Sequence, residues 1–292
     1  MPDSTAAVTV TRPHTVDDYK SSAKPTWCPG CGDFGVLNAV YNALKVQGYH
    51  TEDIVVVSGI GCSSRFPFFV NAYGFHGVHG RAIPIATGVK MANPDLKVLV
   101  VGGDGDALAI GGGHFVHGMR RNVDVTYVIM DNEIYGLTKG QTSPTSNVGF
   151  ITKSTPKGSV DQPLNPLALA LISGATFVAR GFSGKPKELA DLIVQGINHP
   201  GMALIDCYSP CPTFNEVNTF KFFRDVTKAI ATDHDAGDRA AAIELALQDD
   251  PLYCGLFYQT TASESFDRRV RRLQTQDADA PAVMARLFEQ FS

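Results

Sequence analysis

The sequence is poor in charge, has no basic excess and contains no long apolar run. Charged residues make up 18% of its 292 residues, below the roughly 25% of an average soluble chain. The 25 Lys and Arg stand against 29 Asp and Glu, for a net charge of −4, so we expect no nucleic-acid partner. Polar residues interrupt the longest apolar stretch, at 166–179. It falls short of the roughly 18 residues of a membrane span, and we expect no such span.

The amino terminus lacks the apolar core of a secretory signal. Residues 1–24 are polar and irregular, which predicts an extended N-terminal arm and a cytoplasmic location. Thiols stay reduced in the cytoplasm, so the six cysteines of the chain indicate metal ligands or redox groups before disulfides. A hydrophobic content of 44% suffices for a sizeable core, which excludes a wholly disordered chain.

Apolar, β-rich runs alternate with helix-like segments from residue 54 onward. Such runs are typical of strands that are buried on both faces of a parallel sheet. They lie at 54–59, 98–103, 125–130 and 203–206. The helix candidates lie at 33–44, 82–92, 112–121 and 186–197, and Asp33 is expected to cap the first. The alternation predicts an α/β fold with a doubly wound, mainly parallel sheet, which binds ligands beyond the carboxyl ends of its strands.

The chain is expected to divide into three parts. The arm, 1–24, precedes a main α/β domain at 25–221, in which the segment 141–165, rich in Pro, Gly, Ser and Thr, is predicted to be a long functional loop. Residues 222–292 are more charged, and we expect a tail that packs on a partner. Its helix candidates lie around 237–248 and 281–291.

A glycine-rich turn with two carboxylates follows one of the predicted strands. Gly103-Asp104-Gly105-Asp106 is not a dinucleotide-binding turn, because Leu108 stands where that fingerprint needs a third glycine. Two carboxylates repel a bare phosphate, whereas Mg²⁺ between them and a phosphate reverses the sign. Asn132, 28 positions after Asp104, follows the next strand and supplies a second oxygen.

This two-part pattern resembles the thiamine diphosphate motif. The resemblance implies that Asp104, Asn132 and the carbonyl of Ile134 bind Mg²⁺. It also implies that the neighbouring residues of the turn line the diphosphate. These are Gly103, Gly105 and Asp106.

Four cysteines follow loops that the fold is able to bring together. Cys28 and Cys31 form a Cys-x-x-Cys pair, Cys62 follows the first strand, and Cys211 follows a later one. A thioredoxin-like motif should follow a strand, and the composition of 21–26 is not typical of one. Four thiolates suit zinc or an iron–sulfur cluster, and their spacing alone does not choose between them. The remaining Cys207 and Cys254 have apolar neighbours and are expected to be buried thiols.

Several segments together resemble the beta subunit of a 2-oxoacid:ferredoxin oxidoreductase, with the 2-oxoglutarate type nearest. They are 27–35 (WCPGCGDFG), 59–64 (GIGCSS), 79–96 (HGRAIPIATGVKMANPDL), 131–145 (DNEIYGLTKGQTSPT) and 209–215 (SPCPTFN). This resemblance covers about residues 20–260. It implies a 4Fe–4S cluster on Cys28, Cys31, Cys62 and Cys211, because a thiamine carbanion beside such a cluster has an outlet for electrons and one beside zinc has none.

The resemblance also implies further site residues. The cofactor-binding set is Cys62, Ser63, His79, Gly103, Asp104, Gly105, Asp106, Asn132, Tyr135, Gly136, Leu137 and Thr138. Leu137 would support the bent cofactor, and Arg65 and Lys139 are candidates to bind a substrate carboxylate. The alternatives are a core leucine, solvated basic residues and, for His79, a purely structural hydrogen bond.

The family resemblance implies a heterodimeric enzyme that this chain does not complete alone. The glutamate that activates the aminopyrimidine belongs to a separate domain, and we find one glycine-turn domain here. We therefore expect an alpha partner, oxidative decarboxylation of a 2-oxoacid to its acyl-CoA, and ferredoxin as electron acceptor. Three alternatives stay open: a pyruvate-specific member, a non-oxidative thiamine diphosphate decarboxylase or synthase, and a zinc-stapled thiol module without thiamine.

Overall fold

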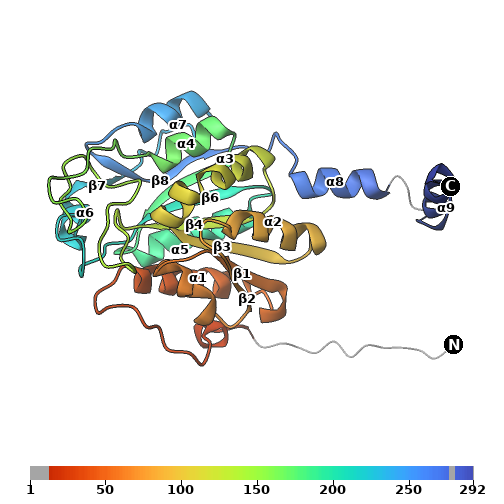
Figure 1. Cartoon of the computed structure of the whole chain (residues 1–292), viewed down its shortest axis with the longest axis horizontal. Helices are drawn as coiled ribbons and strands as arrows, with labels where there is room; N and C mark the ends of the chain where they lie inside the picture. The colour runs from red at the N-terminus through yellow and green to blue at the C-terminus, as the bar shows by residue number, and fades with distance from the viewer. Residues whose placement is uncertain (1–12, 276–279, 292) are drawn as a thin grey trace.

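The computed structural model describes residues 13–275 and 280–291. Its centre is an eight-stranded sheet with the order β2-β1-β3-β4-β6-β5-β8-β7 (Figure 1). The strands are β1 (Ile54–Ser58), β2 (Tyr73–His76), β3 (Lys97–Gly103), β4 (Thr126–Asp131), β5 (Phe177–Phe182), β6 (Ala203–Tyr208), β7 (Thr227–Ala229) and β8 (Leu252–Gln259). All neighbours are parallel except β5 and β8, which run antiparallel. The predicted α/β fold with a mainly parallel sheet is confirmed.

Helices cover both faces of the sheet. One face carries α1 (Asp33–Gln47) against α5 (Pro186–Asn198), and the other carries α2 (Ala82–Ala92), α3 (Gly112–Arg121), α4 (Pro166–Ser173) and α7 (Arg239–Ala246). The central strands are buried on both faces, as β1 and β4 show along their whole length. Apolar burial on both faces supplies the driving force for this three-layer arrangement. The helices predicted at 82–92, 112–121 and 186–197 are confirmed.

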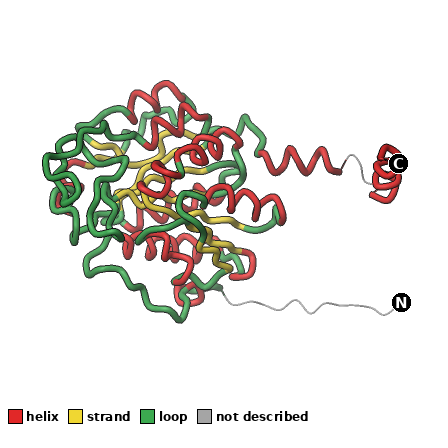
Figure 2. The backbone as a smooth tube through the Cα atoms, in the orientation of Figure 1, coloured by secondary structure: helices red, strands yellow, loops and turns green. Residues whose placement is uncertain are grey.

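The remaining elements are short or peripheral. Helix α6 (Phe220–Val226) precedes β7, and α8 (Phe266–Thr275) projects from the body (Figures 1 and 2). The last helix, α9 (Ala280–Phe291), and α7 confirm the two helix candidates of the C-terminal part. Three 3₁₀ turns lie at Val16–Tyr19, Thr51–Asp53 and Ser63–Phe68, and a π-helical turn lies at Gly105–Ile110. None of the helices in the described ranges has the length and apolar character to cross a membrane.

The expectation that Asp33 caps the first helix is wrong. The N-cap is Gly32, and Asp33 is the first helical residue. Its carboxylate accepts a hydrogen bond from the hydroxyl of Ser209 at 2.8 Å and is only 1% exposed. Asp33 therefore ties the start of α1 to the loop after β6, a tertiary contact that local capping patterns do not contain.

Parts of the N-terminal arm and of the C-terminal segment pack on the body of the chain. Within the arm, Tyr19 is fully buried, and its hydroxyl donates to the carbonyl of Tyr49 at 2.8 Å. Residues 1–12 of the arm lie outside the described residues. The sheet continues past residue 221, because β7 and β8 join it and α7 packs on α4. A further contact of 222–292 with a partner stays a prediction.

Candidate active site

The loops after β1, β3 and β4 enclose a cavity of about 160 Å³ at the carboxyl ends of these strands. A larger cavity of about 500 Å³ lies elsewhere, between α5, β7 and β8, and contains none of the predicted cofactor residues. The smaller one is lined by Ile60, Gly61, Cys62, Ser63, His79, Gly103, Asp104, Gly105, Asp106, Asn132, Ile134, Tyr135, Gly136, Leu137 and Thr138. The structure thus places the whole predicted cofactor-binding set around one space.

The predicted magnesium ligands follow two paired strands. Gly103 of β3 lies opposite Met130 of β4, which brings Asp104 and Asn132 to the same edge. Asp104 is 2% exposed, and burial raises the pKa of its carboxyl to about 6. The side-chain oxygen of Asn132 accepts the backbone N–H of Ile134 at 3.1 Å. A divalent cation here would offset the cost of burying the Asp104 charge.

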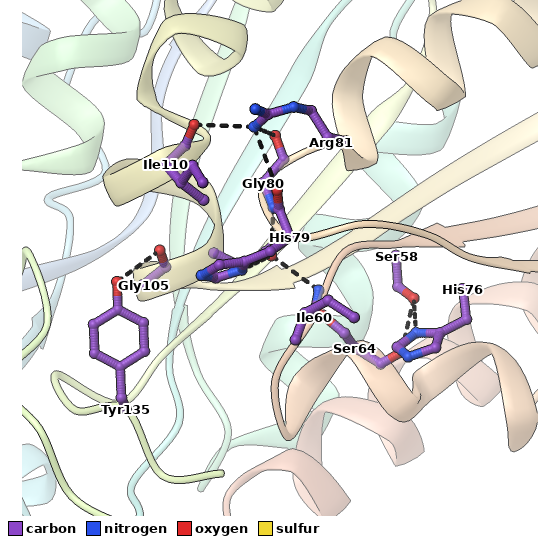
Figure 3. Close-up of polar contacts among 11 residues, drawn as sticks. Ser58, Ile60, Ser64, His76, His79, Gly80, Arg81, Gly105, Ile110 and Tyr135 are labelled. Carbon is purple, nitrogen blue, oxygen red and sulfur yellow. Dashed lines mark hydrogen bonds and ion pairs between the residues drawn. The ribbon is translucent and has the colours of Figure 1, made fainter. Parts of the chain in front are cut away.

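The second carboxylate of the turn faces other loops. Oδ1 of Asp106 accepts the backbone N–H of Ile60 at 2.9 Å, the backbone N–H of Gly80 at 2.7 Å and Nδ1–H of His79 at 2.7 Å. Figure 3 shows Ile60, His79 and Gly80 converging, with Arg81 bonded to the carbonyl of Ile110 above them. Asp106 thus holds the loop after β1 to the start of α2.

This contact also sets the orientation of His79. A carboxylate beside Nδ1 favours the tautomer with its proton there, which leaves Nε2 as an acceptor. The second oxygen of Asp106 has no hydrogen-bond partner among the described residues, although it is buried. Asp106 lines the cavity as predicted, and its role along a diphosphate stays a prediction.

At two positions near the cavity, a neighbouring side chain lies so close to the backbone that only glycine fits. A Cβ on Gly105 would lie 2.2 Å from the ring of Tyr135, whose hydroxyl donates to the Gly105 carbonyl at 3.1 Å. A Cβ on Gly59 would lie 2.0 Å from Oδ2 of Asp106. The glycines of these turns therefore admit the side chains that build the cavity wall.

The loop after Ile134 is a compact turn with an exposed tip. Its base is closed by two hydrogen bonds, from Tyr135 N–H to the Gln141 carbonyl and from Gly140 N–H to the Tyr135 carbonyl, each at 2.9 Å. Leu137 at the tip is 41% exposed and lines the cavity. Lys139, at φ 75°, is exposed and lies outside the lining.

Arg65 also lies outside the cavity lining. One of its guanidinium N–H groups donates to the hydroxyl of Thr26 at 3.1 Å, in the loop before Cys28. The structure thus does not bring Arg65 and Lys139 into the lining. Their contact with a substrate stays a prediction.

The four predicted cluster cysteines lie on three loops beside this turn. Hydrogen bonds tie the loops together, from Trp27 Nε1–H to the Cys62 carbonyl at 2.7 Å and from Gly32 N–H to the Pro210 carbonyl at 2.9 Å. A Cβ on Gly136 would lie 3.5 Å from Sγ of Cys211 and 3.7 Å from Sγ of Cys62. The cysteine site therefore adjoins the cofactor cavity through Gly136.

Three of the four thiols, those of Cys31, Cys62 and Cys211, lie where a bare thiolate is unfavourable. Burial raises the pKa of Cys62 to about 11 and raises the pKa values of Cys31 and Cys211 as well, with the Asp33 carboxylate adding to each. Bound metal ions supply the positive charge that deprotonates such thiols. Within the described ranges, no three His, Cys, Asp or Glu side chains converge on a site for a single metal ion.

Four polar residues behind the cavity were not predicted, namely Asp131, Glu133, Thr145 and Asn218. The hydroxyl of Thr145 lies 2.8 Å from both Oδ2 of Asp104 and Oδ1 of Asp131, and Asn218 donates to the carboxylate of Glu133. A hydroxyl has one proton, so one of the two carboxyls must supply the second. Burial, reinforced by the Asp104 charge, raises the pKa of Asp131 well above its usual value and keeps that proton on Asp131. For Thr145, the composition of the loop 141–165 predicted a functional segment but did not identify the residue.

Comparisons with known proteins agree with this geometry. Residues 59–207 match the family model "Thiamine pyrophosphate enzyme, C-terminal TPP binding domain". Residues 211–275 match the family model for the C-terminal part of the pyruvate ferredoxin oxidoreductase beta chain. Fold and site thus define a thiamine pyrophosphate-binding domain.

Similar proteins identify the family within this class of thiamine pyrophosphate-binding domains. A 2-oxoacid:ferredoxin oxidoreductase beta subunit of Aeropyrum pernix is 42% identical, covering 92% of this chain and 91% of its own. A 2-oxoglutarate oxidoreductase subunit KorB of Mycobacterium tuberculosis is 51% identical over 71% of this chain and 56% of its own. A structure of 2-oxoglutarate:ferredoxin oxidoreductase from Magnetococcus marinus, with 2-oxoglutarate, coenzyme A and succinyl-CoA bound, has a TM-score of 0.91 at 46% identity. It covers 95% of this chain and 97% of that one. The chain belongs to the beta subunits of 2-oxoacid:ferredoxin oxidoreductases, which confirms the predicted family.

Proposed function

We propose that this chain binds the diphosphate half of thiamine diphosphate through Mg²⁺ and carries a 4Fe–4S cluster in a 2-oxoglutarate:ferredoxin oxidoreductase. One observation carries the proposal. Gly136 belongs to the cofactor cavity and has the sulfurs of Cys62 and Cys211 directly beside it. A redox cluster bound there would adjoin the cofactor that it serves.

The donor groups fit the two metal sites. Asp104, Asn132 and the Ile134 carbonyl are oxygen donors, and Mg²⁺ typically takes few protein oxygens and fills its shell with phosphate and water. By ligand type the cysteines suit zinc or an iron–sulfur cluster. We favour the cluster because the relatives are ferredoxin oxidoreductases, and zinc offers no outlet for electrons. Cys28, Cys31, Cys62 and Cys211 would hold the cluster.

The chemistry divides between cofactors and protein. When bound, thiamine diphosphate supplies the nucleophile for a 2-oxo group, and the cluster supplies one-electron chemistry. The chain's own residues orient and shield these groups. Leu137 supports the cofactor at the cavity, and His79 presents Nε2 because Asp106 holds Nδ1–H. Arg65 and Lys139 are the proposed contacts for a substrate carboxylate.

The size of the cavity supports an alpha partner. Sites for molecules of cofactor size usually enclose roughly 300–1,000 Å³, whereas this cavity has about 160 Å³. Near it, the edge strand β2 and the following loop expose Tyr73, Phe75 and Val78 by 61%, 49% and 69%. Exposed apolar clusters of this kind mark interaction surfaces. We expect the alpha partner to cover them and to supply the activating glutamate.

The relatives' substrates indicate the reaction. We propose oxidative decarboxylation of 2-oxoglutarate with coenzyme A, with electrons passed through the cluster to ferredoxin. The bound molecules of the Magnetococcus marinus structure support this choice. A pyruvate-specific member is the second candidate, because the chain also matches a pyruvate ferredoxin oxidoreductase family model over 211–275.

Anaerobic co-expression with the alpha partner tests the proposal. We expect four iron and four sulfide per beta chain, bound thiamine, and ferredoxin reduction that needs both 2-oxoglutarate and coenzyme A. Cys211→Ser should lose iron and ferredoxin reduction together. The matched control Cys254→Ser, outside the four-cysteine site, should lose neither. Zinc without sulfide, or decarboxylation without ferredoxin reduction, would contradict the proposal.

A further inference from the structure

The proposed magnesium ligand Asp104 is held by a residue from a distant part of the chain. Thr145 is 6% exposed and lies in the loop 141–165, far from β3 in sequence. Its hydroxyl is 2.8 Å from Oδ2 of Asp104 and 2.8 Å from Oδ1 of Asp131. It therefore joins the ends of two neighbouring strands, β3 and β4, directly at the carboxylate that would bind the metal.

The position of Thr145 is itself fixed by a folded turn. The hydroxyl of Ser146 donates to the carbonyl of Glu133 at 2.6 Å and accepts the backbone N–H of Ser143 at 2.8 Å. A further hydrogen bond closes the turn, from Ser146 N–H to the Ser143 carbonyl at 3.1 Å. These contacts attach the start of the long loop to the backbone beside Asn132, so Thr145 has little freedom to leave Asp104.

We propose that Thr145 is a positioning residue for the metal site. Its hydroxyl holds the Asp104 carboxylate in one orientation, so that the ligand is ordered before Mg²⁺ arrives. The inference rests on the proposed Mg²⁺ site at Asp104. Groups that hydrogen-bond a metal ligand typically account for about 10–100-fold in metal affinity.

The test uses the assembled complex, stripped of metal with a chelator and supplied with thiamine diphosphate. Mn²⁺ replaces Mg²⁺ as the probe, and loss of the free Mn²⁺ electron paramagnetic resonance signal measures its binding. Thr145→Val keeps the shape and removes the hydroxyl, and Thr145→Ser keeps the hydroxyl. The matched control is Thr152→Val, since the Thr152 hydroxyl bonds only within its own turn, to Ser154 and Thr155.

We expect Thr145→Val to weaken Mn²⁺ binding by about 10–100-fold, and Thr145→Ser and Thr152→Val to stay near the wild type. Equal affinity of Thr145→Val and wild type would overturn the inference. A wild type that binds no Mn²⁺ with thiamine diphosphate would instead overturn the proposed function.

The wild type provides a second test if Thr145→Val does not assemble. Metal binding should fix the Asp104 carboxylate in place and, through its hydrogen bond, the Thr145 hydroxyl as well. Backbone amides at 142–147 should therefore exchange more slowly with deuterium when Mg²⁺ and thiamine diphosphate are added. Unchanged exchange would contradict the inference.

Discussion

Two carboxylates of one turn line the candidate cofactor cavity and make different contacts. Asp104 and Asp106 stand two residues apart, and both are at least 97% buried. Asp104 accepts a side-chain hydroxyl from Thr145, whereas Asp106 accepts two backbone N–H groups and a histidine on one oxygen. Asp104 is the proposed cation ligand, and Asp106 holds the surrounding loops together.

This difference shows that a sequence motif predicts where a residue lies in the fold better than it predicts which groups its side chain contacts. The sequence pattern predicts that both carboxylates face the cofactor. After Asp104 the backbone enters the π-helical turn at Gly105–Ile110, and this turn directs Asp106 toward Ile60 and Gly80. Turns of this type recur at functional sites.

The largest expected effect is on metal binding, and it distinguishes the role of Asp104 from that of Asp106. Asp104→Asn should weaken Mn²⁺ or Mg²⁺ binding by more than about 100-fold, beyond the range for residues that only support a ligand. Stability of the metal-free complex should not fall, because burial raises the pKa of Asp104 to about 6, so its charge at neutral pH costs stability that a neutral Asn does not. Metal titration and thermal unfolding measure both. A large loss of stability with normal metal affinity would reverse the assignment.

A second substitution should give the opposite result. Asp106→Ala leaves the buried N–H groups of Ile60 and Gly80 without their acceptor, at a cost of roughly 1–3 kcal/mol each. We expect the thermal midpoint to fall accordingly, with Asp106→Asn falling less because it keeps an oxygen in place. Metal affinity should change far less than in Asp104→Asn. An unchanged midpoint in Asp106→Ala would show that the wall does not depend on this carboxylate.

The smallest expected effect concerns the hydrogen bond from Tyr135 to Gly105, the residue between Asp104 and Asp106. Tyr135→Phe removes the hydroxyl that donates to the Gly105 carbonyl and keeps the ring that fills the space over Gly105. The expected loss is about 0.5–1.5 kcal/mol, the range of a single hydrogen bond. Thermal unfolding of the complex checks it, and metal affinity serves as the control. A loss of metal binding would mean that Tyr135 acts on the ligand side as well.

Local patterns predict the centre of the fold well and its edges poorly. Strands β1, β3, β4 and β6 are continuous apolar runs, which only burial on both faces produces. The edge strand β2 and strand β8, which lies next to the other edge, have no such pattern, since β2 is exposed and β8 is interrupted by Gly255. The apolar stretch at 166–179 also divides unexpectedly, because Gly174, at φ 98°, ends α4 and allows β5 to begin.

The candidate site likewise contains residues that the sequence predicts and residues that it does not. The cavity lining comes from short motifs, each next to a strand end, and the family resemblance of these motifs predicts most of its residues. Thr145 and the Asp33–Ser209 bond depend on segments that are distant in sequence. Only the tertiary structure brings these together, and no spacing rule contains them.

In the proposed function, a cysteine-bound cluster beside Gly136 takes electrons from the cofactor cavity. The most direct measurement adds 2-oxoglutarate to the anaerobic complex, with thiamine diphosphate and Mg²⁺ bound, and records the electron paramagnetic resonance spectrum of the cluster. We predict that 2-oxoglutarate produces the signal of a reduced cluster in the wild type and in Cys254→Ser, and none in Cys211→Ser. Release of carbon dioxide from 2-oxoglutarate with no reduction of the wild-type cluster would contradict the account.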